Sequence, residues 1–204
     1  MKAILSTTPG GPETLVFQDT PDPEPGPDEV LIDVKACGVN FPDTLIIRDL
    51  YQFNPERPFS PGGEVAGVVS ATGANVTSFK AGDRVAAMTI YGGFAEKVVQ
   101  RPEGLTPLPD GVSFATASAL LMTYGTSIHA LQDRAALKPS ETLFVMGAAG
   151  GVGLAAVELG AAMGAKVVAA ASTEEKLAVC REYGASETIL YPRAPFDRDT
   201  AERV

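Results

Sequence analysis

A glycine-rich turn between an apolar run and an alanine-rich run has the composition of a phosphate-binding loop. It follows Thr142–Met146, precedes Leu154–Met163 and reads Gly147, Ala148, Ala149, Gly150, Gly151, Val152, Gly153. Glycine at 150 would let the backbone approach a pyrophosphate, and glycine at 153 would let helix and strand pack closely. The N-terminus of the following helix would offer N–H groups and a positive dipole end to the anion. An alanine replaces the first glycine of the usual G-x-G-x-x-G pattern. A further expected strand over 165–171 completes a β-α-β unit, so the sequence predicts a dinucleotide site.

The residues at the end of that further strand favour one nicotinamide cofactor over the other. NAD sites place an Asp or Glu there to bind the ribose 2′-hydroxyl, whereas this chain has Ser172 and Thr173, followed by Glu174, Glu175 and Lys176. Hydroxyls and a lysine suit a 2′-phosphate, which favours NADPH. Alternatively, Ser172 caps a helix, Glu175 completes a capping box and Lys176 points to solvent. Both interpretations can hold together, because a helix N-cap is itself an anion site.

Composition narrows the class of protein. A chain of 204 residues with 45% hydrophobic residues can bury a core and form one or two domains. There is no apolar run of membrane-spanning length and no signal-peptide pattern, so we expect no membrane partner. Two cysteines without paired spacing, Cys37 and Cys180, favour the reducing cytoplasm. A net charge of −9 argues against nucleic acid as a partner, but it does not oppose an anionic cofactor in a cleft.

The first half of the chain has a different pattern from the second. Short apolar runs between Pro- and Gly-rich turns predict a rolled antiparallel β domain, with strands over Lys2–Leu5, Glu29–Val34, Glu64–Val69, Arg84–Met88 and Phe94–Val99. From Ser113 to Leu131 the sequence becomes small and helical. We place the domain boundary within that stretch, giving domains at 1–122 and 123–204.

The order of several motifs resembles the medium-chain dehydrogenase/reductase superfamily. These motifs are Pro61–Val69, Gly73, Val76, Phe79, Gly82–Val85 and Gly92–Glu96. Three more segments narrow the resemblance to the zinc-free quinone oxidoreductase branch, the zeta-crystallin-like proteins: Cys37–Asn40, Gly147–Gly153 and Ser172–Lys176. The resemblance implies a GroES-like β-barrel catalytic domain followed by a Rossmann domain, an α/β plus β fold, with NADPH in the cleft between them. It also implies a homodimer.

A catalytic zinc is not expected. Zinc needs three or four converging Cys, His or carboxylate ligands, and this chain has two distant cysteines and one histidine, His129. In zinc-dependent relatives a Cys stands at the position of Asn40 and a His at that of Gly63. We therefore expect no metal, and we expect His129 to be a packed or surface side chain.

Without zinc, oxidising an alcohol would lack a group to stabilise the alkoxide, whereas reducing a quinone or enone needs only hydride, alignment and a donor for the oxyanion. Asn40 is the first candidate donor; alternatively it holds the turn before Pro42. Tyr51 resembles the family's cleft-lining tyrosine, or it is a core tyrosine, and Asp43 is expected to hydrogen-bond within the fold. Thr123 resembles the family's threonine near the nicotinamide, or it is an ordinary helix hydroxyl. Tyr191 matches a position that flanks the 2′-phosphate in relatives.

The Rossmann part is expected to be incomplete, because family members continue well beyond Val204. We therefore expect the chain to be a fragment, a shortened variant or an incomplete sequence of a longer protein. Three functions remain: an NADPH-dependent quinone or enone reductase, a 2-enoyl thioester reductase, and a non-catalytic NADPH-binding or structural protein.

Overall fold

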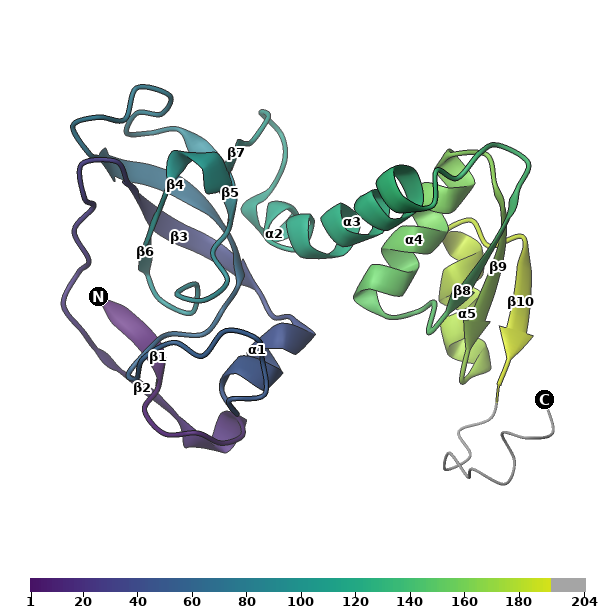
Figure 1. Cartoon of the computed structure of the whole chain (residues 1–204), viewed down its shortest axis with the longest axis horizontal. Coiled ribbons are helices and arrows are strands. Elements are labelled where there is room, and N and C mark those ends of the chain that lie inside the picture. Colours follow the sequence, from purple (N-terminus) through teal and green to yellow (C-terminus); the bar gives the residue numbers. More distant parts are fainter. Residues whose placement is uncertain (192–204) are drawn as a thin grey trace. The chain divides into compact units, whose positions relative to one another are not determined.

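The computed structural model describes residues 1–191, and the chain divides into two compact units, Met1–Met122 and Thr123–Val204. They are the N-terminal and the C-terminal unit (Figure 1). The end of the predicted second domain, residues 192–204, lies outside the described residues.

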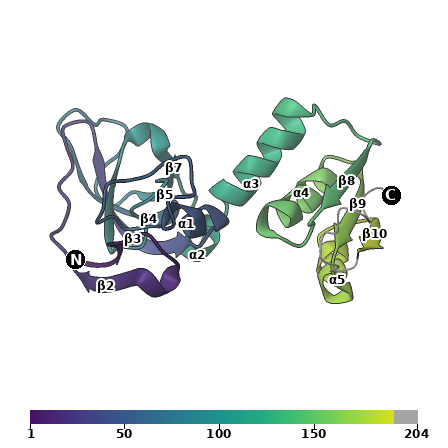
Figure 2. The same cartoon turned by 60° about the horizontal axis from the view of Figure 1, so that its bottom comes forward.

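The N-terminal unit is built on an antiparallel sheet with strand order β6-β3-β4-β5-β7. Its strands are β3 (Val30–Gly38), β4 (Glu64–Thr72), β5 (Arg84–Met88), β6 (Lys97–Gln100) and β7 (Leu105–Pro107). Two further strands, β1 (Lys2–Ser6) and β2 (Leu15–Asp19), form a separate antiparallel ribbon beside it (Figure 2). Single bridges, Ala3 with Ala95 and Ser6 with Phe59, connect the ribbon to loops of the unit. The predicted antiparallel β domain is confirmed, with β2 and β7 as additional strands.

Alternating β-branched residues explain this sheet. Inward-facing positions of neighbouring strands meet in one cluster with no or little solvent exposure, formed by Val30, Ile32, Val65, Val69, Val85, Ala87, Val98 and Leu105. β-Branched side chains pack well on a pleated surface and lose little rotamer freedom there. The cluster fixes the register of β3 against β4, and that register places Cys37 opposite Val65 and Gly38 opposite Glu64.

Short helices connect these strands, and three of them have a proline in the first turn. Pro12, Pro42 and Pro102 occupy the first turns of η1 (Pro12–Thr14), α1 (Phe41–Ile46) and η2 (Pro102–Gly104). Proline is suited to this position because its missing N–H would have no partner in a helix anyway. The helix α2 (Phe114–Ala117) begins at Ser113, whose hydroxyl accepts from Thr116 N.

The helical stretch predicted from 113 to 131 is not continuous. It breaks after α2, resumes as α3 (Leu121–Ile128) and ends in a π-helical turn, η3 (His129–Arg134). His129 is solvent-exposed and its Nδ1 lies 2.8 Å from Asp133 Oδ2, which confirms the expectation of a surface or packed side chain.

The C-terminal unit is a β-α-β-α-β arrangement around a parallel sheet with order β10-β9-β8. Its elements are β8 (Thr142–Met146), α4 (Gly151–Ala162), β9 (Lys166–Ala171), α5 (Glu174–Glu182) and β10 (Glu187–Leu190). The helices α4 and α5 pack against the sheet (Figure 1). Small residues allow close packing there: a Cβ on Gly160 would lie 2.5 Å from Leu143 Cδ2. The predicted β-α-β order is confirmed, although α4 begins at Gly151, three residues earlier than expected.

Candidate active site

The glycine turn joins β8 to α4 and leaves three backbone donors at the helix start. Gly147 has φ +65°, a left-handed conformation that favours glycine, and Gly150 N donates to Gly147 O at 3.0 Å. The first hydrogen bond of α4 runs from Leu154 N to Gly150 O at 2.7 Å. The N–H groups of Gly151, Val152 and Gly153 come before it in the chain and therefore have no carbonyl partner within the helix. The first turn of α4 has no acidic residue to compete for its positive end. The turn can therefore receive an anion.

Two members of the turn face inward and support its shape. Ala148 is fully buried, and its N–H donates to Ala170 O of β9 at 3.0 Å. A Cβ on Gly153 would lie 2.5 Å from Gly147 O, whereas a Cβ on Gly150 would meet only that same oxygen, at 3.4 Å. Glycine at 153 is therefore required by packing, and the absence of a side chain at 150 leaves the outer side of the turn open.

The cap of α5 differs from the prediction. Thr173, not Ser172, is the N-cap: its Oγ1 accepts from Lys176 N at 3.4 Å. The assignment of Ser172 as cap is therefore wrong by one residue, because two hydroxyl residues in succession fit the capping pattern almost equally well. Within residues 1–191 the Ser172 hydroxyl has no hydrogen-bond partner and Lys176 Nζ forms no ion pair. Both groups remain available to a ligand.

Six of the predicted cofactor residues line one pocket of the C-terminal unit. A small pocket of about 40 Å³ lies at the carboxyl ends of the parallel strands and is lined by Gly147, Ala149, Gly150, Ala171, Ser172, Lys176 and Tyr191. Tyr191 follows β10, and its N–H donates to Ala171 O at 3.1 Å, which holds it beside β9. Ligands bind open α/β sheets at this edge. No carboxylate of residues 1–191 lines the pocket.

Thr123 lies against the same turn. Its Cγ2 stands 3.0 Å from where a Cβ on Gly151 would be, so the α3 helix packs directly on the start of α4. One turn further along α3, the buried Ser127 donates its hydroxyl to Val152 O at 2.8 Å. Thr123 is thus placed among the predicted cofactor residues, while its role toward a nicotinamide stays a prediction.

In the N-terminal unit, Asn40 begins α1 and is held by two carboxylates. Its backbone N–H donates to Asp43 Oδ2 at 2.7 Å, and its side-chain Nδ2 donates to Glu64 Oε2 at 3.2 Å. Asp43 is buried and also accepts from Gly62 N at 3.2 Å, which confirms that it hydrogen-bonds within the fold. Burial raises the pKa of the Asp43 carboxyl, and these backbone donors act in the opposite direction. Asn40 therefore holds the turn before α1, and its side-chain amide has a second N–H besides the one that donates to Glu64.

The Cys37 thiol lies close to this pair of carboxylates without being reactive. Burial, together with the negative charges of Asp43 and Glu64, raises the pKa of Cys37 to about 12. The packing around its sulfur is tight, since a Cβ on Gly62 or Gly93 would lie 2.9 or 2.7 Å from Sγ. Cys37 is therefore a packed thiol and not a nucleophile.

Tyr51 is packed at the edge of a small apolar cluster. It lies against Ile46, Ile47 and Phe59, and its ring centroid is 6.0 Å from that of Phe53 in a tilted arrangement. This supports the core interpretation, and a role of Tyr51 toward substrate stays a prediction.

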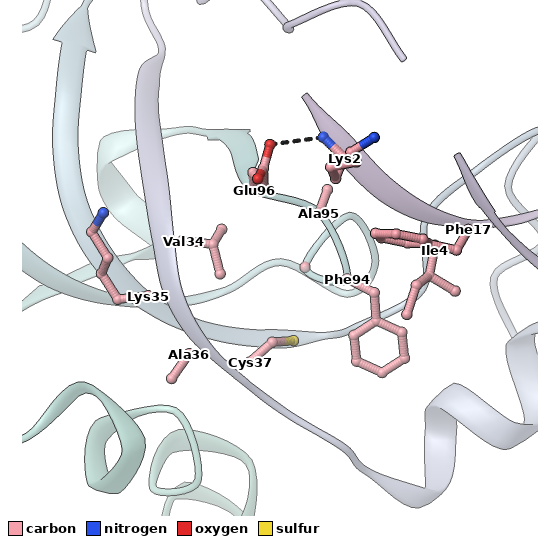
Figure 3. A pocket seen from close by; sticks show the side chains of 11 residues that line it. Lys2, Ile4, Phe17, Val34, Lys35, Ala36, Cys37, Phe94, Ala95 and Glu96 are labelled. Atoms are coloured by element: carbon pink, nitrogen blue, oxygen red, sulfur yellow. Dashed lines mark hydrogen bonds between the residues drawn. The ribbon is translucent and has the colours of Figure 1, made fainter. Parts of the chain in front are cut away.

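Two pockets of the N-terminal unit differ in their relation to Asn40. One of about 120 Å³ is lined almost wholly by apolar atoms and lies beside α1, with Pro12, Leu15, Val39, Asp43, Thr44, Ile47, Pro61 and Phe94 around it. The other, about 420 Å³, lies between the β1–β2 ribbon and β3, with the Cys37 sulfur and the Phe94 ring among its lining groups (Figure 3). Asn40 lines neither pocket, but the smaller one is lined by its sequence neighbours Val39 and Asp43.

No group of three or more His, Cys, Asp or Glu in residues 1–191 is arranged to hold a metal ion, and a zinc-free site stays a prediction. Over the same part of the chain, no helix has the length and apolar character needed to cross a membrane.

Comparison with known proteins places this fold and site in a family. Residues 26–110 match the alcohol dehydrogenase GroES-like domain, and residues 151–204 match the family described as zinc-binding dehydrogenase. The chain belongs to the medium-chain dehydrogenase/reductase superfamily, and within it to the quinone oxidoreductase branch.

Individual relatives agree with this placement. The chain is 39% identical to quinone oxidoreductase-like protein 2 of Rattus norvegicus over 94% of its own length and 55% of that protein. It is 40% identical to quinone oxidoreductase of Homo sapiens, over 93% of the chain and 58% of that protein. The structure of Escherichia coli quinone oxidoreductase complexed with NADPH matches with a TM-score of 0.90 at 32% identity, covering 100% of this chain and 62% of that one. The chain thus spans somewhat more than half of the length of these curated relatives.

Sequence reasoning missed two residues that organise the site. Thr173 was overlooked as a cap because Ser172 offers the same chemistry one residue earlier. Glu64 was quoted only as part of a motif, yet it is fully buried and contacts Asn40. A charged residue directly before the apolar run Val65–Val69 was the available signal, since buried carboxylates are rare unless paired.

Proposed function

We propose that this chain carries the NADPH site and the oxyanion donor of a zinc-independent reductase of quinones or related conjugated carbonyls. The observation that carries the proposal is the convergence of the glycine turn with Ser172, Lys176 and Tyr191 on one pocket that no carboxylate of residues 1–191 lines. The division at residues 122 and 123 corresponds, in this proposal, to a GroES-like catalytic domain and the first part of a Rossmann domain.

The choice of NADPH rests on charge and hydrogen bonding at the end of β9. A 2′-phosphate would accept from the Ser172 hydroxyl and pair with the Lys176 ammonium, and neither group has another partner in residues 1–191. The pyrophosphate would lie on the open N–H groups of Gly151 and Val152. The Escherichia coli relative is itself an NADPH complex, which supports the same choice.

The proposed reaction requires few chemical groups from the protein itself. When bound, NADPH supplies a hydride to an electrophilic carbon conjugated with a carbonyl group. Charge then develops on the substrate oxygen, and Asn40 would donate its second amide N–H to that oxygen. The apolar pocket beside α1 would exclude water from one side of the ring, and solvent would supply the proton that completes the hydroquinone or the saturated ketone.

Replacement of Asn40 tests this proposal on the natural full-length polypeptide. With 1,4-benzoquinone as acceptor, Asn40→Ala should lower kcat for NADPH oxidation by roughly ten- to a thousandfold, about 1.4–4 kcal/mol of transition-state stabilisation. The dissociation constant for NADPH should change far less, because its phosphate contacts lie in the C-terminal unit. A variant that turns over quinone at the parent rate would remove Asn40 from the mechanism, and a parent that reduces only 2-enoyl thioesters would replace the substrate class.

We also propose that the protein acts in the cytoplasm as a homodimer. The two free thiols, Cys37 and Cys180, support a reducing compartment, and the dimer is what the family resemblance implies.

A further inference from the structure

Glu64 is a fully buried carboxylate at the start of β4, and it contacts two separate elements of the N-terminal unit. Its Oε1 accepts from the backbone N–H groups of Leu121 and Met122 at 2.5 and 3.1 Å, at the beginning of α3. Its Oε2 accepts from Asn40 Nδ2 at 3.2 Å. All three partners are N–H donors, so each contact uses Glu64 as an acceptor. An ionised carboxylate satisfies that demand completely.

The backbone of Gly38 lies close to the contact between Glu64 and Asn40. A Cβ on Gly38 would lie 2.2 Å from Ser118 O, 3.2 Å from Glu64 Oε2 and 3.4 Å from Asn40 Nδ2. Any side chain at position 38 would therefore displace either the α2–α3 connection or the contact between Glu64 and Asn40. The absence of a side chain at Gly38 therefore leaves room for the contact between Glu64 and Asn40.

An asparagine amide has a donor end and an acceptor end, and rotation by half a turn about its last bond exchanges them. Only the donor end can face Glu64 Oε2, because two acceptors would repel each other. The carboxylate thus acts together with the capping box of α1, in which the Asn40 side chain faces the Asp43 N–H, to decide which way the Asn40 amide points. Glu64 accepts a hydrogen bond from one N–H of the Asn40 amide, and the other N–H then points in a defined direction.

We propose that Glu64 is a positioning residue that sets the donor orientation of Asn40. This inference rests on the proposed function of Asn40, but the orientation itself can be measured without any reaction. The same carboxylate holds the first turn of α3, so one side chain fixes the oxyanion donor and the start of a helix together.

The test is Glu64→Gln, which keeps the size of the side chain and removes one acceptor. The side-chain carbonyl of the introduced glutamine can still accept from Leu121 and Met122, which places its NH₂ opposite Asn40. The Asn40 amide must then rotate to present its oxygen, and its donor turns away from the substrate. Glu96→Gln is the matched control, since Glu96 Oε2 also accepts a backbone N–H, that of Lys2 at 2.7 Å, without contacting Asn40.

The primary readout is the side-chain amide signal of Asn40 in a ¹⁵N–¹H spectrum, assigned by its loss in Asn40→Ala. We expect Glu64→Gln to shift this signal and Glu96→Gln to leave it in place. An unchanged signal in Glu64→Gln overturns the inference, whatever the activity of either variant.

The second readout is a kinetic double-mutant cycle. Glu64→Gln should lower kcat about tenfold or more with KM for NADPH changed by less than about twofold, and it should add less than about twofold in the Asn40→Ala background. An equal loss in both backgrounds means that Glu64 acts through the fold alone, which overturns the inference. If the amide signal shifts but Asn40→Ala keeps the parent rate, the orientation by Glu64 stands and the proposed role of Asn40 fails.

If Glu64→Gln is destabilised but still unfolds cooperatively, combining it with Asn40→Asp gives a stability readout. The introduced aspartate would face Glu64 as a second acceptor, whereas the glutamine introduced by Glu64→Gln could donate to it. The double variant should therefore have a higher midpoint of unfolding than additivity of the two single variants gives. Strict additivity would contradict a direct contact between the two side chains.

Discussion

Gly153 offers the sharpest test of how the glycine turn is built. In Gly153→Ala the new methyl group would lie 2.5 Å from Gly147 O and 2.9 Å from Ala148 Cα. The first distance is about 0.9 Å shorter than the 3.4 Å at which ordinary contact begins. Both neighbours are backbone atoms, so no side chain can rotate away and the turn itself must move.

The expected magnitude follows from two opposing effects. Overpacking of this kind costs about 1–3 kcal/mol, whereas alanine gains about 1 kcal/mol over glycine inside a helix. Gly125 in α3 provides the matched control, because it is exposed and a Cβ there would meet nothing within 4 Å. Gly125→Ala should therefore stabilise the protein by about 1 kcal/mol, and the two variants should differ by about 1–3 kcal/mol.

Urea and thermal unfolding followed by circular dichroism measure this difference. At about 2–4 °C per kcal/mol for a chain of this size, Gly153→Ala should melt several degrees below Gly125→Ala. NADPH affinity, measured by fluorescence titration, should fall in Gly153→Ala and stay at the parent value in Gly125→Ala. Equal melting temperatures for the two variants would refute the argument that the turn leaves no room for a side chain at 153.

Three further predictions concern cofactor, metal and thiol. NADPH should bind at least about tenfold more tightly than NADH, about 1.4 kcal/mol, and Ser172→Asp should erase or reverse that preference by repelling the 2′-phosphate; equal affinities in the parent protein would contradict this. Prolonged treatment with a strong chelator should leave activity intact, whereas stoichiometric zinc lost together with activity would overturn the zinc-free mechanism. Because the pKa of Cys37 is raised from 9.0 to about 12, its alkylation below pH 9 should be roughly a thousandfold slower than that of a free thiol and should rise about tenfold per pH unit. A plateau near pH 9 in mass-spectrometric labelling would show an ordinary thiol instead.

The elements with strong local signals could be predicted from the sequence. The run Thr142–Met146, the glycine turn and the alanine-rich helix are confirmed as β8, the turn and α4. Hydrophobic runs bounded by glycine and proline indicate strands because the backbone at their ends must turn. β2 and β7 were not predicted: β7 has only three residues, and pairing with β1 and β5 makes the two segments strands.

The N-cap of α5 could not be predicted from residue types alone. Ser172 and Thr173 are equivalent as caps by residue type, so the sequence alone could not decide which of them caps α5. The end of β9 at Ala171 and its pairing with β10 decided that Thr173 caps and that Ser172 lines the pocket.

By itself the sequence determined which residue types could bind a dinucleotide phosphate, and the family resemblance implied that Asn40 stands where zinc-dependent relatives have a ligand. Residue identity and spacing suffice for the phosphate site, because a glycine turn between a strand and a helix leaves backbone N–H groups open to an anion. Only the tertiary structure decided that Glu64 lies against Asn40. The two residues are 24 positions apart, and their contact exists because the register of β3 on β4 places Gly38 opposite Glu64. Strand register depends on how the whole valine and isoleucine cluster packs, and no local stretch of sequence contains that information.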